Sequence, residues 1–298
     1  MKRIILGLFL SLVFGMSVYA QSDVCAKKVS VQQVKDALEP VLGGAKVIKV
    51  SPSPVKGLYE VIVEARGRQI PVYIDCSERY LITGEIIDLK EKKSITRERA
   101  RELAKKVVEE KMKKLEKVLG KEKIEKLKKA LGERFADIKI VDLKKIPKEN
   151  LILFGNPAAK MTVYVVTDPE CPFCAKFDTE MMKVLEKRKD VKFELILFPL
   201  PFHKHAQKIV QRIVCEESVK KKKEILEKSF KAVRERDEKK LAQLGKECEK
   251  GKKVIQEHFK FGSEAGIGGT PAIIFPYGIM VSGWMTADQI NKVLDALK

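Results

Sequence analysis

The sequence predicts an α+β protein in three parts: a small N-terminal domain of strands and one helix, a charged helical segment, and a larger C-terminal domain. Three observations predict this class. Short strand-like runs separated by turn residues lie before residue 94, a lysine- and glutamate-rich stretch of helical periodicity follows, and after residue 150 apolar strand-like runs occur together with amphipathic helical patterns. Both periodicities in one chain are typical of mixed folds.

The first residues have the pattern of a cleavable secretory signal. Lys2 and Arg3 precede an apolar stretch from Ile4 to Val18, and small residues at the required offsets predict cleavage after Ala20. We therefore expect residues 1–20 to be removed and the protein to be exported to the periplasm, where disulfides persist. An uncleaved membrane anchor is the alternative, but this stretch is short for a span of about 20 apolar residues.

Basic residues outnumber acidic ones by 60 to 41, which gives a formal net charge of +19. The excess is strongest in residues 94–150, where lysines and glutamates recur at helical spacing without regular aromatic interleaving. A solvated helix face explains this pattern better than a nucleic-acid-binding surface. We expect neither a nucleic-acid partner nor stable membrane insertion.

Residues 21–93 are predicted to form a small α+β domain. Apolar residues at Val31, Val34 and Leu38 recur at helical intervals before Pro40 stops the helix. Turn residues then separate four strand-like runs, which are Lys46–Val50, Tyr59–Ala65, Gln69–Asp75 and Tyr80–Ile87. A domain of about 70 residues has a marginal core by itself, so pairing with a second copy is expected.

Residues 94–150 are predicted to form a helical linker. Ser94 can cap the helix, and Gly120 offers a break within it. The apolar stripe is narrow and consists of Ala104, Val108, Met112, Leu115 and Leu119, then Ile124, Leu127 and Leu131. Such a stripe on a charged rod favours a connector between domains over a helix packed along its own domain.

The motif Cys171-Pro172-Phe173-Cys174 lies between the apolar run Val163–Val166 and an amphipathic pattern that begins at Phe177. A helix N-terminus stabilises a thiolate, and two intervening residues let the second sulfur close a ring with the first. This context predicts a thiol-disulfide site in which Cys171 attacks and Cys174 resolves. Half of a zinc site is the alternative, but no second ligand pair accompanies it, so no metal or other cofactor is expected.

A second candidate segment lies near the C-terminus, in the run Gly268 to Phe275. Thr270-Pro271 precedes a hydrophobic strand-like sequence, and a proline at a strand start cannot donate to the ladder. A cis Thr270-Pro271 bond explains this placement.

Together these features resemble the thioredoxin fold. Residues 151–174, which end in Asp-Pro-Glu-Cys-Pro-Phe-Cys, resemble the entry to the catalytic domain of the periplasmic disulfide isomerases DsbC and DsbG, and Gly269–Ala272 matches their Gly-Thr-Pro-Ala segment. The resemblance implies a thioredoxin-like catalytic domain over 151–298 with a helical insertion at about 202–262. It also implies that Thr270 and Pro271 contact substrate and that residues 21–93 form a dimerisation domain.

The six cysteines allow 15 pairings. The resemblance implies a structural disulfide between Cys215 and Cys248 in the insertion. Cys25 and Cys76 then pair by elimination, with a free or intermolecular thiol as the alternative.

By this resemblance the protein is expected to be a homodimeric thiol:disulfide isomerase and reductase. Its partners would be unfolded or misoxidised exported proteins, and a transmembrane thiol reductase would donate electrons to the Cys171-Cys174 disulfide. The alternatives are a thiol oxidase, which would start from the disulfide, and a holdase chaperone, which would act without redox chemistry.

Some residues of the C-terminal domain depart from the pattern of related proteins, and others have a less specific interpretation. The dipeptide is Pro172-Phe173 and not the Gly-Tyr of the best-known isomerase. Glu170 is a hypothetical proton carrier, and its charge would oppose ionisation of Cys171 if the two groups are close. His203-Lys204-His205 is interpreted as a solvated helix start, and Trp284 is expected to pack against the last helix.

Overall fold

The computed structural model describes residues 25, 29–38, 40–43, 45–65 and 68–298. The predicted secretory signal lies outside these residues. The chain divides into two compact units, one up to Ala104 and one from Lys105, and each is described by itself. Among the helices of the described residues, none is long and apolar enough to cross a membrane.

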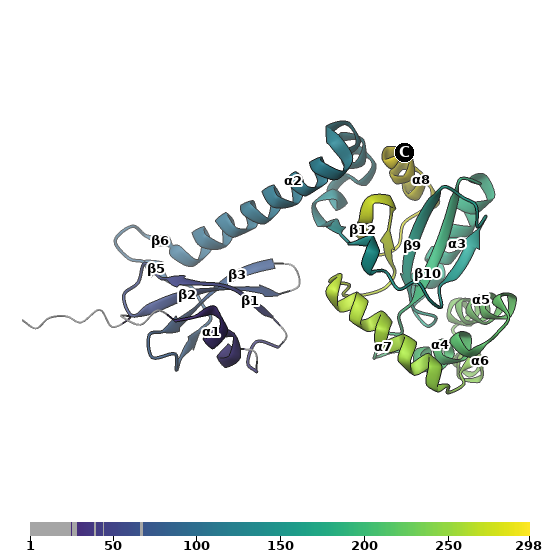
Figure 1. Ribbon diagram of the computed structural model, residues 1–298, viewed down its shortest axis with the longest axis horizontal. Coiled ribbons are helices and arrows are strands. Elements are labelled where there is room, and N and C mark those ends of the chain that lie inside the picture. The colour runs from purple at the N-terminus through teal and green to yellow at the C-terminus, as the bar shows by residue number, and fades with distance from the viewer. Residues whose placement is uncertain (1–24, 26–28, 39, 44, 66–67) are drawn as a thin grey trace, which may run out of the picture. The chain divides into compact units, whose positions relative to one another are not determined.

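The N-terminal unit is an antiparallel sheet with α1 (Val31–Leu38) on one face (Figure 1). Alternation along the second strand directs every other side chain to α1, so Val34 and Leu38 pack on Tyr59, Val61 and Val63. The sheet order is β1 (Lys46–Pro52), β2 (Leu58–Ala65), β3 (Arg68–Asp75) and β4 (Leu81–Ile82).

The opposite face of this sheet contacts the beginning of α2 (Ile95–Leu131). The Tyr73 hydroxyl lies 3.1 Å from the Thr96 hydroxyl. The Arg99 guanidinium donates to the nearly buried Glu60 carboxylate at 3.0 Å. The two central strands are therefore covered by α1 on one face and by the start of α2 on the other. This explains why consecutive side chains in both strands are buried instead of every second one.

The predicted strand Tyr80–Ile87 is wrong in extent. Only Leu81–Ile82 pairs with β3, and β5 (Ile87–Asp88) forms a separate hairpin with β6 (Lys93–Ser94). The Thr96 hydroxyl accepts from the Ile86 N–H and donates to the Gly84 carbonyl. These backbone groups bond to the start of α2, so they are not available to a longer ladder.

The predicted cap and break of the long helix are both confirmed. The Ser94 hydroxyl accepts from the Arg97 N–H at 3.1 Å, and Gly120 adopts φ 72°, ψ 165°, which separates two helical pieces. Within the predicted apolar stripe, Ala104 and Val108 are exposed. The later apolar residues of the stripe are buried in the core of the C-terminal unit; they are Leu115, Leu119, Ile124, Leu127 and Leu131. The helix from Leu115 onward is therefore packed on the C-terminal unit.

The C-terminal unit contains a six-stranded sheet in the order β7-β12-β11-β9-β10-β8, in which β9 and β10 are parallel. Short 3-10 helices connect its parts; they are η1 (Gly132–Asp137), η2 (Leu143–Lys145) and η3 (Pro276–Gly278). The strands are β7 (Lys139–Ile140), β8 (Ile152–Gly155), β9 (Met161–Thr167), β10 (Val191–Leu197), β11 (Ala272–Ile274) and β12 (Ile279–Ser282).

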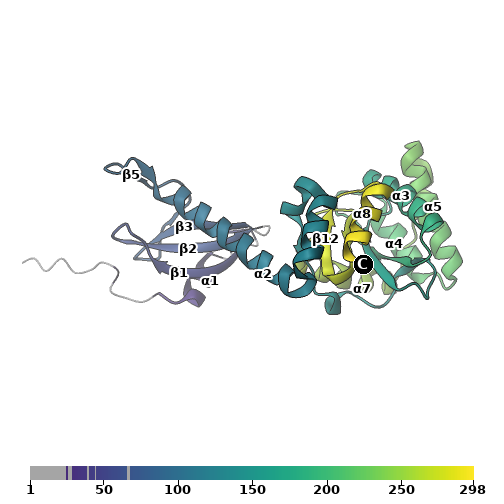
Figure 2. The same ribbon diagram turned by 90° about the horizontal axis from the view of Figure 1, so that it is seen from above.

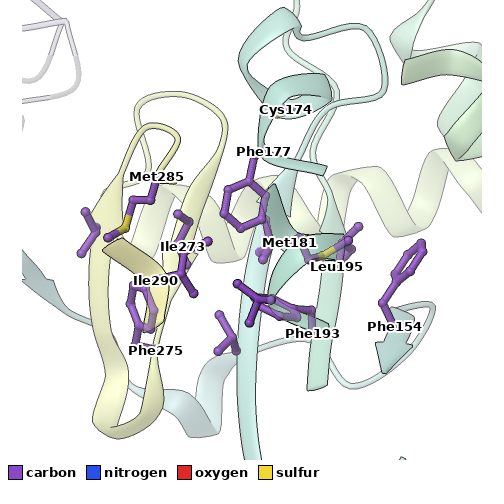
Figure 3. Packing of buried hydrophobic residues seen from close by; sticks show 14 of the residues in the cluster. Phe154, Cys174, Phe177, Met181, Phe193, Leu195, Ile273, Phe275, Met285 and Ile290 are labelled. Atoms are coloured by element: carbon purple, nitrogen blue, oxygen red, sulfur yellow. The ribbon is translucent and has the colours of Figure 1, made fainter. Parts of the chain in front are cut away.

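Helices cover both faces of this sheet (Figures 1 and 2). On one face, α3 (Pro172–Lys187) and α8 (Ala287–Leu297) bury the main core. Figure 3 shows Phe177 and Met181 of α3 pointing toward Phe193, Leu195 and Ile273 of the strands. On the other face, α7 (Glu249–Glu264) packs Phe261 beside Val166, Ile196 and Ile274 of the strands.

Four helices lie between β10 and β11, where the sequence predicts an insertion. They are α4 (Ala206–Cys215), α5 (Val219–Glu235), α6 (Glu238–Leu244) and α7. The Cys215–Cys248 disulfide joins the last residue of α4 to the N-cap of α7. A Cβ at Gly251 would lie 2.5 Å from the Cα of Gln211, so glycine permits the close approach of these two helices.

Candidate active site

Cys171 is the N-cap residue of α3, and Pro172 is the first residue of the helix. Strand β9 ends at Thr167, and the connecting turn closes with a hydrogen bond from the Cys171 N–H to the Asp168 carbonyl at 3.2 Å. Proline suits this position because it has no N–H, and the N–H of the first helical residue would have no partner within the helix. The Cys171 sulfur therefore lies at the positive end of the helix dipole.

The two cysteines of the motif are unpaired thiols, and both are buried, with 5% of Cys171 and 1% of Cys174 exposed. A hydrogen bond from Cys174 is the main cause that lowers the pKa of Cys171 to about 6, helped by Thr270 and by the N–H groups of Cys174 and Phe173, while burial opposes this change. Burial is the main cause that raises the pKa of Cys174 well above its usual value, and the charge of Cys171 adds to it. The pair thus combines a thiolate with a thiol that keeps its proton.

The Thr270-Pro271 bond is cis, as the sequence predicts. The Cys171 thiol lies 3.4 Å from the Thr270 carbonyl, although the two residues are 99 positions apart. Pairing of β11 with β9 produces this contact, because Ala272 lies opposite Val166 in the ladder.

The Thr270 hydroxyl is also buried beside the sulfurs. Its oxygen makes no hydrogen bond of ordinary geometry with the described residues. It nevertheless lies close enough to lower the pKa values of both Cys171 and Cys174. A hydroxyl can rotate its proton toward a sulfur that becomes negative.

Two aromatic side chains near the cysteines are exposed to solvent. Phe173, inside the motif, is 52% exposed, and Phe202, in the loop after β10, is 74% exposed. The Phe202 ring contacts the His203 ring edge-on at 4.7 Å between centroids. Exposed aromatic surface beside a reactive thiol can bind apolar side chains of an unfolded chain.

The Glu170 carboxylate has a different role from the proton carrier that the sequence suggests. It accepts hydrogen bonds from the N–H groups of His205 and Ala206 at 2.7 and 2.8 Å. It thus caps the start of α4, where a negative charge is favourable. This engagement does not favour Glu170 as the proton carrier for Cys171.

The interpretation of His203 as part of a solvated helix start is wrong. Its Nδ1 donates to the fully buried Asp168 carboxylate at 2.8 Å, and only 16% of its side chain is exposed. Sequence reasoning missed this pair because 35 residues separate its members. The available signal was an acidic residue immediately after the strand, three positions before Cys171.

Trp284 is also placed differently from the expectation. It is 37% exposed, and Met285 beside it is the residue that enters the core.

The remaining cysteines form two disulfides, Cys215–Cys248 and Cys25–Cys76. The second one ties the segment before α1 to the end of β3, and these two bonds leave Cys171 and Cys174 as the free pair among the described residues.

Comparisons with known proteins agree with this organisation. The model of the disulfide bond isomerase protein N-terminal domain matches residues 22–97, and the model of the thioredoxin-like domain matches residues 147–298. None of the curated proteins matches the chain.

Among solved structures, a periplasmic thioredoxin-like protein from Salmonella enterica serovar Typhimurium is 19% identical with a TM-score of 0.45, over 53% of this chain and 99% of that chain. The catalytic domain of Proteus mirabilis ScsC is 19% identical with a TM-score of 0.44, over 57% and 98%. Wolbachia pipientis alpha-DsbA1 is 16% identical with a TM-score of 0.42, over 51% and 92%.

The thioredoxin-like match alone covers more than half of the 298 residues. With the isomerase-type domain before it, the chain belongs to the thioredoxin-like family as a DsbC/DsbG-like member.

Proposed function

We propose that this protein is an exported thiol:disulfide isomerase and reductase that rearranges non-native disulfides in secreted proteins. The observation that carries the proposal is a free thiol pair at the start of α3, with the Cys171 sulfur 3.4 Å from the Thr270 carbonyl, in a chain whose residues 22–97 match the disulfide bond isomerase N-terminal domain. The pKa of Cys171, lowered to about 6, and that of Cys174, raised well above its usual value, support it. At neutral pH this pair has one nucleophile and one protonated thiol in reserve.

The reaction begins when the Cys171 thiolate attacks a substrate disulfide. A sulfur-sulfur bond forms to Cys171, and the other substrate sulfur leaves with the electron pair as a thiolate. If a substrate thiolate then displaces Cys171, the substrate is isomerised and the enzyme stays reduced. If Cys174 displaces the substrate instead, the substrate is reduced and the Cys171-Cys174 disulfide forms, which a transmembrane thiol reductase would reduce again.

Thr270, Pro271 and the exposed Phe173 and Phe202 support the binding of an extended, partly apolar chain next to Cys171. The match of residues 22–97 to the isomerase N-terminal domain supports a homodimer. Two active sites in one dimer would raise the effective concentration of a bound substrate.

A thiol oxidase is the second candidate, since a low thiolate pKa stabilises the reduced enzyme and makes its disulfide a stronger oxidant. Two assays separate these activities: recovery of scrambled ribonuclease measures isomerisation, and oxidation of reduced ribonuclease measures oxidase activity. We expect the reduced protein to restore activity to scrambled ribonuclease, Cys171→Ser to lose this activity, and Cys174→Ser to keep part of it and accumulate a mixed disulfide. Rapid oxidation of reduced ribonuclease without rescue of the scrambled form, together with a monomeric mass in sedimentation, would favour the oxidase.

A further inference from the structure

Asp168 connects both cysteines to the loop that follows β10. Its main-chain carbonyl accepts from the Cys171 N–H at 3.2 Å, and its main-chain N–H donates to the Cys174 sulfur at 3.4 Å. Its buried carboxylate accepts from the N–H groups of Leu200 at 2.6 Å and Glu170 at 2.7 Å. One residue therefore fixes the motif and the loop with respect to each other.

The His203 ring completes this arrangement. Its Nδ1 lies 2.8 Å from the Asp168 carboxylate, and the Phe202 ring contacts it from the solvent side. A buried carboxylate is costly without a hydrogen-bonded cationic partner, and His203 supplies one. The ring is thereby held in one orientation beside the cysteine motif.

The charges around His203 favour its protonated form. The hydrogen bond to Asp168 is the main cause that raises the pKa of His203, burial opposes it, and the charges of Asp168, Glu170 and Cys171 add to it. On its own segment, Lys204 is exposed, and the His205 ring is directed to Glu238 of α6 at 3.4 Å. The Cys171 thiolate thus favours protonated His203, and because coupling between two sites is reciprocal, protonated His203 favours the thiolate.

We propose that His203, held by Asp168, is a positioning residue of the thiol-disulfide reaction that supplies the cation stabilising the attacking thiolate of Cys171. The inference rests on the proposed function only in that Cys171 is the attacking sulfur. The cation adds to the hydrogen bond from the Cys174 thiol and to the effect of the nearby Thr270 hydroxyl, both of which lower the pKa of Cys171. It acts in the reduced enzyme, since a disulfide at Cys171 carries no charge.

The first test measures the His203 pKa by NMR in the reduced and the oxidised full-length protein. The chain has three histidines, so His205 and His258 serve as internal controls. We expect oxidation to lower the His203 ionisation midpoint by roughly half a unit to one unit, about a threefold to tenfold change in the ionisation constant, and to leave the others unchanged. Equal His203 midpoints in both forms would overturn the proposal.

The second test compares His203→Asn with His205→Asn. Asparagine places its amide near the position of Nδ1, so it can still donate to Asp168 but carries no charge. In His203→Asn, thiolate absorbance should show the Cys171 ionisation constant reduced about threefold to tenfold relative to the wild type. His205→Asn should match the wild type. A wild-type curve in His203→Asn, or the same change in both variants, would contradict the role of His203.

The two proposals can fail separately. If the wild type does not rescue scrambled ribonuclease but His203 and Cys171 titrate as coupled groups, the isomerase proposal fails and the assignment of His203 stands. If rescue occurs and the two groups titrate independently, only the assignment of His203 fails. Should His203→Asn not fold, the NMR comparison on the wild type decides the matter without it.

Discussion

Arg234 of α5 donates a hydrogen bond at 3.0 Å to the main-chain carbonyl of Ala175, in the first turn of the helix that carries the cysteines. The same guanidinium group lies 3.7 Å from the Asp178 carboxylate, one turn farther along α3. These contacts tie the helical insertion to the cysteine helix. They also place an ionisable carboxyl group at a largely buried position.

Asp178→Asn is expected to stabilise the protein at neutral pH. Burial is the main cause that raises the pKa of Asp178 from 3.8 to about 6, and the charge of Arg234 opposes this. The folded state therefore binds this proton more tightly than the unfolded state, and stability falls as pH rises from about 4 to about 6. Removing the carboxylate should restore up to about 3 kcal/mol above pH 7 and nothing below pH 4.

Urea unfolding of the wild type and Asp178→Asn between pH 4 and pH 8 measures this difference. Asp288→Asn, in which the replaced side chain is 72% exposed, is a matched control that should change stability by less than about 0.5 kcal/mol. A constant difference between Asp178→Asn and the wild type at every pH would show that ionisation of Asp178 is not its cause.

Alkylation of the reduced protein should modify Cys171 with a half-maximal rate near pH 6, since its pKa is lowered to about 6 from 9.0. Cys174 should stay unmodified up to alkaline pH because its pKa is raised and it is buried. By linkage, the reduced protein gains stability as pH rises from about 6 to about 9 and loses this contribution as pH falls through 6. Iodoacetamide labelling with peptide mapping provides the measurement, and a midpoint close to pH 9 would be incompatible with the geometry described.

Thr270→Val should raise the pKa of Cys171 while keeping the shape of the loop. The hydroxyl lowers this pKa, and valine has a similar volume without a donor. We expect a rise of about half a unit to one unit, with a proportionally slower alkylation at pH 6. Thr162→Val, on the same sheet at the opposite end of β9, is the control. An unchanged thiolate titration in Thr270→Val would exclude a contribution from the hydroxyl.

Replacement of Cys215 and Cys248 by alanine should destabilise the insertion without changing the thiolate of Cys171. The bond closes a loop of 33 residues, for which chain entropy gives a contribution of about 4 kcal/mol. The Cys248 sulfur also accepts the Gly251 N–H at the start of α7, so its loss removes a cap. Thermal unfolding monitors the loss of stability, and an unchanged melting temperature would argue against a structural role for this bond.

The features that the sequence predicts correctly around the site depend on short stretches of chain. The strand before Cys171, the helix that begins at Pro172, the cis Thr270-Pro271 bond and the break at Gly120 all follow from neighbouring residues. Proline and glycine restrict or permit particular backbone angles wherever they occur, and apolar periodicity marks the buried face of a strand or helix. These constraints act locally, so one sequence is sufficient to recognise them.

The errors concern residues whose neighbours come from distant parts of the chain. Ile86 bonds to the start of α2 rather than to β3, and Trp284 is exposed where Met285 is buried. The periodicity of these segments alone permits either outcome. Only the competing contacts in the folded protein decide which backbone groups form hydrogen bonds with which partners and which side chains are buried.

The sequence by itself determined that a cysteine pair follows a strand and that a Thr-Pro loop precedes another. The tertiary structure alone decided how that pair is tuned, because Cys171 and Thr270, whose contact lowers the pKa of Cys171, are 99 residues apart. Electrostatic and hydrogen-bond contributions to a pKa depend on distances of a few ångströms. Such distances are set by the packing of the sheet, the loop after β10 and the inserted helices.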